Sequence, residues 1–392
     1  MTTAMTTYRA TVTGALVLAL AGFSEGRAQG NLSTFGFGYP PGQLSARAQA
    51  TGGSIAEMDP VSTLNPAALL NWGGSAIYFQ IEPEFRRVDA VGGSDNTTTA
   101  RYPLTGGALS LGSRWVLGVA ASTFLDRSWA TTARTTHELG EEPVPATTTF
   151  RSQGAINDVR IALAWAARPW LRLGLGAHAL TGQNRLTIVD RFDDTVRYDP
   201  LQQDTSISYA GAALSGGVEL RAGRVASVAA SMRVGGRIRA ESGDATLSRA
   251  TVPNRFGVTV AYLGIANSAI AIRTAYDKWS SLEALGRDGL RAVDAWDTSV
   301  GADVAGPRFG GARVIMLRAG ARWRTLPFAI TQPDEDAAAH RVREQSLSAG
   351  LGTSLARGRA SVDLGVIRAT RDAGLAIDER AWILSIGMSV RP

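Results

Sequence analysis

Hydrophobic residues alternate with small or charged residues along most of this chain, a pattern that predicts β-strands with two different faces. At the C-terminal end, one face carries Trp382, Leu384, Ile386, Met388 and Val390, and the other carries Ser385, Gly387, Ser389 and Arg391. The same pattern predicts fourteen strands, near residues 75–87, 103–112, 115–128, 150–166, 170–186, 206–220, 225–239, 252–263, 268–279, 291–304, 315–324, 346–355, 359–366 and 382–391. An even number of antiparallel strands returns the chain to the side where it started.

Short and long connections alternate between these strands. The short ones include 112–114, 168–169, 221–224, 264–267 and 356–358. The long, polar ones lie near 89–100, 130–148, 187–204, 240–250, 280–290, 328–342 and 371–379. Tight turns at one end and long loops at the other are typical of outer-membrane barrels, whose short turns face the periplasm.

Alternation also describes a soluble β-sandwich, so strand length has to decide between the two folds. Sandwich strands have about 5–6 residues, whereas a tilted membrane-spanning strand needs about 9–11, and the alternation here often reaches the longer length. Aromatic residues at predicted strand ends suit the headgroup level of a bilayer: Phe85, Trp115, Trp165, Trp170, Trp323 and Trp382. We therefore predict an all-β fold, a 14-stranded antiparallel transmembrane β-barrel of the bacterial outer membrane.

The first 28 residues have the parts of a secretory signal peptide. Arg9 is followed by an apolar stretch at 16–21, and the small residues Gly26 and Ala28 precede the expected cleavage point. An uncleaved anchor is the alternative, although the apolar stretch is too short to span a bilayer as a helix. The predicted organisation is a signal peptide (1–28), an N-terminal hatch (29–74) and a transmembrane barrel (75–392).

The composition excludes several function classes. The chain has a net charge of +6, and all but one of its 40 basic residues are arginines, the exception being Lys278. These arginines are scattered along the predicted strands rather than gathered in a patch, so we expect no nucleic-acid partner. There are no cysteines, and the sequence contains no metal-ligand spacing, phosphate loop or nucleophile motif. We expect neither a metal nor a cofactor.

Catalysis in a barrel would need a base beside a nucleophile on one strand face. His137 and His340 lie in predicted long loops. His178 faces the predicted lumen, but its neighbours on that face are Gly176 and Leu180, and neither is a serine. We therefore predict that the protein is not an enzyme.

Residues 29–74 break the strand pattern and contain a series of short motifs. In order, these are Gly36-Phe37-Gly38, Ala46-Arg47-Ala48, Gly52-Gly53, the acidic Asp59, and Asn65-Pro66-Ala67-Ala68-Leu69. This order resembles the N-terminal hatch of the FadL/TodX outer-membrane transporters and of the related PorV-like barrels of type IX secretion. Residues 317–320, 326–328 and 346–352 also look like the C-terminal third of such proteins.

The resemblance implies a hatch in the lumen, with Asn65, Pro66 and Ala67 where the hatch passes into the first strand. Fourteen strands enclose a pore wide enough to need filling or gating. Arg47 is a candidate to pair with a carboxylate on the barrel wall, with a solvated arginine as the alternative. The candidate hatch and gating residues are Arg47, Gly52, Gly53, Asp59, Asn65, Pro66 and Ala67.

The same resemblance implies passive uptake of hydrophobic or amphipathic small molecules such as long-chain fatty acids. The alternatives are a PorV-like, non-transporting barrel that serves protein secretion or surface attachment, and a general diffusion porin. The expected partners are membrane lipid, a hydrophobic ligand and the barrel assembly machinery. Predicted lumen-lining polar residues either orient an acidic head group or neutralise one another together with Glu219: Arg233, Arg237, Asp297, Asp303, Arg318, Arg322, Arg324 and Asp363.

Overall fold

A computed structural model of the chain describes residues 38–90, 93–139, 143–286, 291–309, 313–330, 340–372 and 378–391. The predicted signal peptide and residues 29–37 of the predicted hatch lie outside these ranges. Within them, no helix is both long and apolar enough to cross a bilayer.

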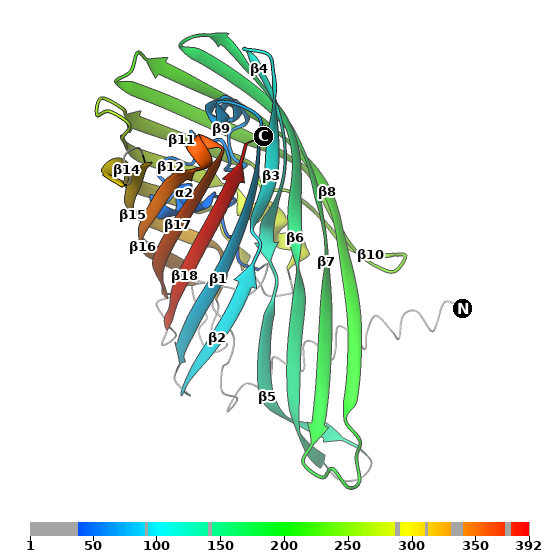
Figure 1. The fold of residues 1–392 in the computed structure, drawn as a ribbon. Helices are drawn as coiled ribbons and strands as arrows, with labels where there is room; N and C mark the ends of the chain where they lie inside the picture. Colours follow the sequence, from blue (N-terminus) through cyan, green and yellow to red (C-terminus); the bar gives the residue numbers. More distant parts are fainter. Residues whose placement is uncertain are drawn as a thin grey trace.

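The described residues form one closed antiparallel barrel (Figure 1). Its strands are β1 (Ala76–Ala90), β2 (Gly93–Arg101), β3 (Leu104–Leu111), β4 (Trp115–Asp126), β5 (Trp129–Glu138), β6 (Pro143–Arg168), β7 (Leu171–Phe192), β8 (Leu201–Ala222), β9 (Ala226–Ser242), β10 (Ala245–Thr251), β11 (Arg255–Tyr262), β12 (Ala269–Asp277), β13 (Arg291–Ala292), β14 (Ala295–Phe309), β15 (Arg313–Ile330), β16 (His340–Leu355), β17 (Ala360–Asp372) and β18 (Asp378–Val390). Pairing of β18 with β1 closes the ring.

Four of the fourteen barrel positions each contain two strand segments: β2 with β3, β4 with β5, β10 with β11, and β13 with β14. Pro103 separates β2 from β3, and Pro253 separates β10 from β11. Proline has no N–H to give to the ladder, so a strand is interrupted where it occurs. Counted by position, the predicted 14-stranded barrel is confirmed.

The two faces of the strands differ as the alternation predicts. The six aromatic residues placed at strand ends are 38–54% exposed on the outer surface. Outward aliphatic residues such as Leu175, Leu214 and Leu347 are even more exposed. Serines, arginines and carboxylates are buried in the interior instead, together with clusters of apolar side chains that pack against the hatch and η3. The apolar side of each strand therefore faces outward, as it does in a membrane barrel and not in a soluble sandwich.

Several predicted loops are strands in the structure. β6, β7 and β8 have 26, 22 and 22 residues, and they include much of the predicted loops at 130–148 and 187–204. Residues 89–90 pair with 93–94, and residues 240–250 form a hairpin. The outward positions of these segments are mostly polar, so their composition resembles that of loops, although their backbones complete the ladder.

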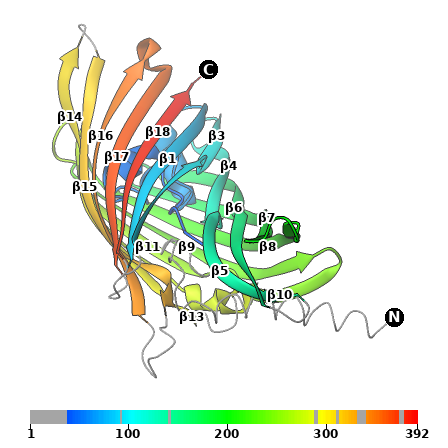
Figure 2. The same ribbon diagram turned by 90° about the horizontal axis from the view of Figure 1, so that it is seen from below.

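The barrel has a turn end and a loop end. At the turn end lie Ala76, Val390 and the short connections, including the 3₁₀ turn η4 (Ala356–Gly358). The long hairpins and the 3₁₀ helix η3 (Trp279–Leu285) lie at the loop end. The N-terminal segment lies inside the wall (Figure 2) and contains the helix α2 (Ala46–Ala50) and the 3₁₀ helix η2 (Pro66–Trp72). We call residues 38–75 the hatch.

Replacing Leu175 with arginine should destabilise the barrel by about 2–4 kcal/mol, because this outward side chain lies in the middle of the apolar band. The control is Val196→Arg, in the connection between β7 and β8, where the side chain is 95% exposed and a charge should have little effect. Urea unfolding in lipid vesicles, followed by tryptophan fluorescence, measures both variants. Equal stability of the two would contradict a lipid-facing outer wall.

Candidate functional site

Tyr39 attaches the start of the hatch to the wall at the end of β4. Its N–H donates to the carbonyl oxygen of Asp126, and the N–H of Asp126 donates back, each at 2.8 Å. The buried ring lies beside the guanidinium groups of Arg101, Arg324 and Arg371, which are 5.1, 5.0 and 4.4 Å from its centroid. Such cation–π contacts strengthen where water is excluded. Backbone and side chain therefore both hold this residue.

Carboxylates on adjoining strands neutralise the arginines around the tyrosine ring. The fully buried Arg371 donates to Glu344 at 2.6 Å and to Glu84 at 2.9 Å, and it also pairs with Glu379. Arg324 donates to the other oxygen of Glu344 at 2.6 Å. Removing one member of a buried pair leaves an uncompensated charge, so these groups depend on one another.

Glu57 anchors the middle of the hatch. Its fully buried carboxylate accepts from Arg255 Nη2 and Ser231 Oγ at 2.6 Å and from Arg273 Nε at 3.2 Å. Burial alone would raise the pKa of Glu57, but the two guanidinium groups hold it below its ordinary value. The carboxylate therefore stays ionised and ties the hatch to three strands of the wall.

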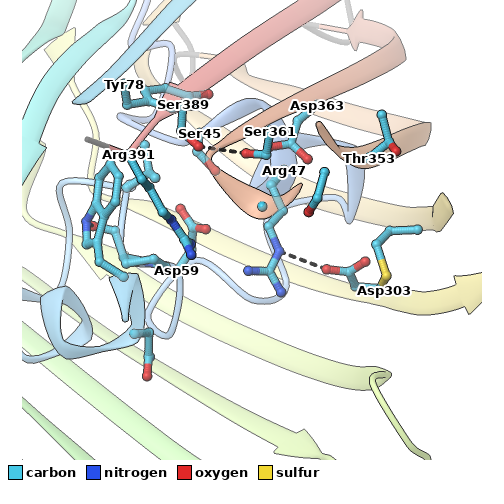
Figure 3. A pocket seen from close by; sticks show the side chains of 18 of the residues that line it. Ser45, Arg47, Asp59, Tyr78, Asp303, Thr353, Ser361, Asp363, Ser389 and Arg391 are labelled. Atoms are coloured by element: carbon cyan, nitrogen blue, oxygen red, sulfur yellow. Dashed lines mark hydrogen bonds and ion pairs between the residues drawn. The ribbon is translucent and has the colours of Figure 1, made fainter. Parts of the chain in front are cut away.

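Arg47 ties the hatch to the wall at the turn end, where its Nε donates to Asp303 at 2.8 Å (Figure 3). Asp303 also accepts from Arg318, which in turn reaches Asp363 at 2.7 Å. Two cavities, of about 600 and 890 Å³, both border the Arg47–Asp303 pair. Because the Arg47 side chain is 41% exposed, we expect this pair to contribute less than the buried ones.

Gln43 joins the hatch to a chain of hydrogen bonds across the wall. Its Nε2 donates to Asp158 at 2.8 Å; Asp158 faces His178 Nδ1 at 2.9 Å, and His178 Nε2 lies 2.8 Å from Ser215 Oγ. His178 Nδ1 carries the proton, because a carboxylate can only accept. Hydrolase triads have the same order of groups. Here all three groups are buried and the aspartate is bonded to the hatch, so we interpret the chain as an anchor.

The predicted hatch glycines and Asp59 shape the hatch itself. Gly52 and Gly53 have φ of +67° and +88°, a region that favours glycine. A Cβ atom on Gly52 would also lie 2.9 Å from the backbone of Ala321 on β15. The Asp59 carboxylate accepts from the N–H and hydroxyl of Ser62 at 2.8 and 2.7 Å. It therefore stabilises a turn within the hatch.

The Asn65-Pro66-Ala67 motif begins η2 rather than the first strand. Asn65 Oδ1 accepts from the N–H of Ala67 at 2.9 Å, and its Nδ2 donates to the Glu57 carbonyl oxygen at 2.7 Å. Pro66 is the first residue of η2, where a missing N–H costs nothing. Because η2 separates the motif from β1, the expected direct passage into the strand is wrong.

The predicted lumen residues, with one exception, face the interior and pair with opposite charges. Asp297 accepts from Arg273 and Arg322, each at 2.8 Å. Arg233 donates to Gln43 of the hatch at 3.1 Å. Glu219 pairs separately, with Arg221 at 2.7 Å. Of the two interpretations of these residues, the geometry favours a mutually neutralising network.

Arg237 is the exception, because it is exposed on the outer surface while its neighbour Ile238 is fully buried. Where β8 pairs with β9, Gly211 lies opposite Ile238 and Ala213 lies opposite Gly235. One residue of β8 therefore spans the same distance as two residues of β9. Such a bulge inserts an extra residue and reverses the alternation beyond it. The prediction of a lumen-facing Arg237 is therefore wrong.

Toward the loop end the interior becomes apolar. Buried side chains from the hatch, η3 and nine of the strands form one packed cluster, which we call the apolar chamber: Tyr39, Phe124, Leu125, Ile156, Leu180, Tyr209, Ala213, Ile238, Ala240, Val252, Trp279, Leu282, Leu285, Ala292, Ala295, Leu326, Phe328 and Val342. Trp279 of η3 stacks on Phe124 of β4, with ring centroids 5.3 Å apart. η3 therefore fills the chamber from the loop end.

Next to this chamber the wall is not continuously paired. β3 pairs with β4, but beyond Pro103 the register of β2 is with β1 and that of β5 is with β6 (Figure 1). Among the described residues, β2 and β5 share no ladder. Arg101, at the end of β2, donates to Asp126, at the end of β4, at 2.6 Å. This ion pair and Tyr39 mark the point where the wall separates.

Sequence reasoning missed Tyr39, Gln43, Glu57 and the partner of His178. Ser215 was missed because it lies on the neighbouring strand β8, which a search along one strand does not reach. One usable signal was the run of inward polar residues on β1, namely Gln80, Glu82, Glu84 and Arg86, which indicates buried charge.

In fold, the chain is similar to solved structures of channels and transporters. A Pseudomonas aeruginosa FadL homologue has a TM-score of 0.62 at 9% identity, with 90% of this chain and 99% of that chain covered. The Ralstonia pickettii toluene transporter TbuX has a TM-score of 0.58 at 13% identity, with 89% and 98% covered. The monoaromatic hydrocarbon channel CymD has a TM-score of 0.54 at 14% identity, with 89% and 97% covered.

No protein-family model matches the chain, and no curated protein matches it significantly in sequence. At these identities the structural likeness establishes a shared fold. The FadL/TodX-type barrel that the hatch motifs implied is thereby confirmed. The likeness to PorV-like barrels stays a prediction.

Glu57→Gln should loosen the hatch far more than Arg47→Ala does. Breaking a buried ion pair costs about 3–5 kcal/mol, whereas a half-exposed pair contributes about 0–1 kcal/mol. Hydrogen exchange of peptides from residues 38–75, with barrel peptides as the internal control, measures the difference. Equal exchange in the two variants would show that Glu57 is not a principal anchor.

Proposed function

We propose that the protein is an outer-membrane channel for passive uptake of hydrophobic or amphipathic small molecules. The observation that carries this proposal is the apolar chamber, a cluster of buried hydrophobic side chains toward the loop end that is more extensive than the apolar clusters elsewhere in the lumen. An interior that served only small polar solutes would have no need for buried tryptophan, phenylalanine and leucine. The fold shared with a toluene transporter and a monoaromatic hydrocarbon channel supports the same cargo class.

The barrel is oriented with its turn end in the periplasm, because short turns face that side in outer-membrane barrels. Cargo enters at the loop end, where η3 must move aside to open the chamber. Below the chamber, the hatch and its ion pairs block the direct path. Cargo therefore leaves sideways, between β2 and β5, where the wall carries no ladder.

An amphipathic cargo such as a long-chain fatty acid would also meet a polar partner beside the chamber. Arg101 and Arg371 each have one buried guanidinium nitrogen without a hydrogen-bond partner in the described part of the chain. Tyr39 contacts both of these arginines and belongs to the chamber. A carboxylate placed there would accept charge-assisted hydrogen bonds.

Trp279→Ala should change toluene entry into vesicles that contain the protein, because it removes the side chain that stacks on Phe124 in the chamber. We expect at least a several-fold change in rate. The matched control is Trp296→Ala, since Trp296 is 59% exposed on the outer surface and should leave the rate unaltered. Identical rates in both variants would argue against passage through the chamber.

A disulfide between positions 39 and 126 tests the sideways exit. The two residues exchange backbone hydrogen bonds, which places their Cα atoms about 5.5 Å apart, a separation that a disulfide spans. Because the native chain has no cysteine, Tyr39→Cys with Asp126→Cys gives a single bridge. Toluene uptake should fall on oxidation and recover on reduction of the same sample. Unchanged uptake in the oxidised form would rule out release of Tyr39 as a step.

A further inference from the structure

Outward residues on β1, β17 and β18 form rows at the loop end of the barrel. Phe85 on β1 lies opposite Trp382 on β18, and Trp382 lies opposite Arg368 on β17. Phe85 and Trp382 are 53% and 51% exposed, and the Arg368 guanidinium lies 5.4 Å from the tryptophan ring centroid. This row marks the loop-end edge of the apolar band.

Two residues farther toward the loop end, an arginine on β1 lies directly opposite an arginine on β18. Arg87 of β1 is the register partner of Arg380 of β18, and both side chains are exposed. On β16, which pairs with β17, the exposed Arg343 and Arg341 extend the basic surface toward the loop end. We call these four residues with Arg368 the arginine rim. Like charges directly opposite on a sheet destabilise it unless an anion lies between them.

The carboxylates nearby neutralise the arginine rim only in part. Asp89, Asp378 and Asp372 form the next row, and Arg87 Nε donates to Asp89 at 3.0 Å. Among the described residues, five arginines against three carboxylates leave a local excess of positive charge. Arg87, Arg380 and Arg368 lie closer to the aromatic row than the carboxylates do, whereas Arg343 is level with Asp372 and Arg341 lies beyond it. The first three arginines are therefore on the membrane side of the carboxylates.

The height of Arg87 and Arg380 matches that of lipid phosphates. Exposed tryptophan and phenylalanine mark the membrane–water interface. Two residues along a strand tilted by about 40° rise roughly 5 Å, so Arg87 and Arg380 lie just above that interface. A guanidinium matches phosphate bidentately, which an ammonium cannot do, and the basic residues of this chain are almost all arginine.

We propose that the arginine rim is a binding site for the phosphate groups of the outer-leaflet glycolipid of the bacterial outer membrane. The site uses the orientation given above, with the loop end outside, and is independent of transport through the lumen. The aromatic row contacts the acyl chains next to the headgroup, while Arg87, Arg380 and Arg368 bind its phosphate. Bound glycolipid would add a phosphate anion between the opposed arginines, beyond the partial neutralisation that Asp89 gives Arg87.

Native mass spectrometry of the full chain with added lipid A tests this proposal. The wild-type protein should retain bisphosphorylated lipid A at least about tenfold more strongly than the same lipid after enzymatic dephosphorylation. The reason is that each arginine near an anionic lipid surface adds to the free energy of binding. Equal retention of the two lipids would overturn the proposal, and this comparison needs no variant to fold.

The paired variant Arg87→Gln with Arg380→Gln should lose most of that preference. Its control is Arg239→Gln with Arg249→Gln, another opposed and exposed pair, which lies on the β9–β10 hairpin away from the aromatic row (Figure 1). Loss of the preference in the control alone, or to the same degree in both, would overturn the assignment to the arginine rim. Toluene uptake should be the same in both paired variants, which separates this result from any failure of the transport proposal.

Discussion

Charges that are buried inside a closed barrel have to neutralise one another, and the hatch is where this barrel meets that requirement. The wall alone presents arginines and carboxylates to a pore that fourteen strands cannot fill with side chains. The hatch brings Tyr39 between three arginines, Glu57 between two others, and Gln43 to Asp158. The ionic residues therefore serve to fix one segment of chain across the lumen.

That arrangement divides the lumen along the barrel axis. The turn end contains the cavities around the Arg47–Asp303 pair and a separate apolar cluster around Leu69 and Trp72 of η2. The hatch and its ion pairs form the middle, and the apolar chamber lies toward the loop end. An apolar molecule in the chamber would have to cross desolvated charges to continue along the axis. The exit that we propose, between β2 and β5, avoids that cost, because the described residues of these two strands share no ladder.

Both surfaces of the wall follow from one period-two pattern. On β1, for example, Glu84 and Arg86 are buried in the lumen, while Phe85 and Arg87 face outward. A substitution on one face therefore acts on the hatch and its charges, and a substitution on the other acts on the contact with lipid. Only a bulge or a proline breaks this division, and the chain uses both.

The sequence by itself determined the strand count, the direction of each face and the aromatic edges, because these depend on local alternation and on side-chain chemistry. It also indicated the hatch and its pairing residue Arg47. It could not give the lengths of β6, β7 and β8, because the outward apolar row that marks a membrane-spanning strand stops where these strands extend beyond the membrane. It placed Arg237 in the lumen, since one inserted residue at Gly235–Gly236 reverses every position that follows. The partners of Tyr39, Glu57 and His178 lie far away in sequence, and only strand register brings them together.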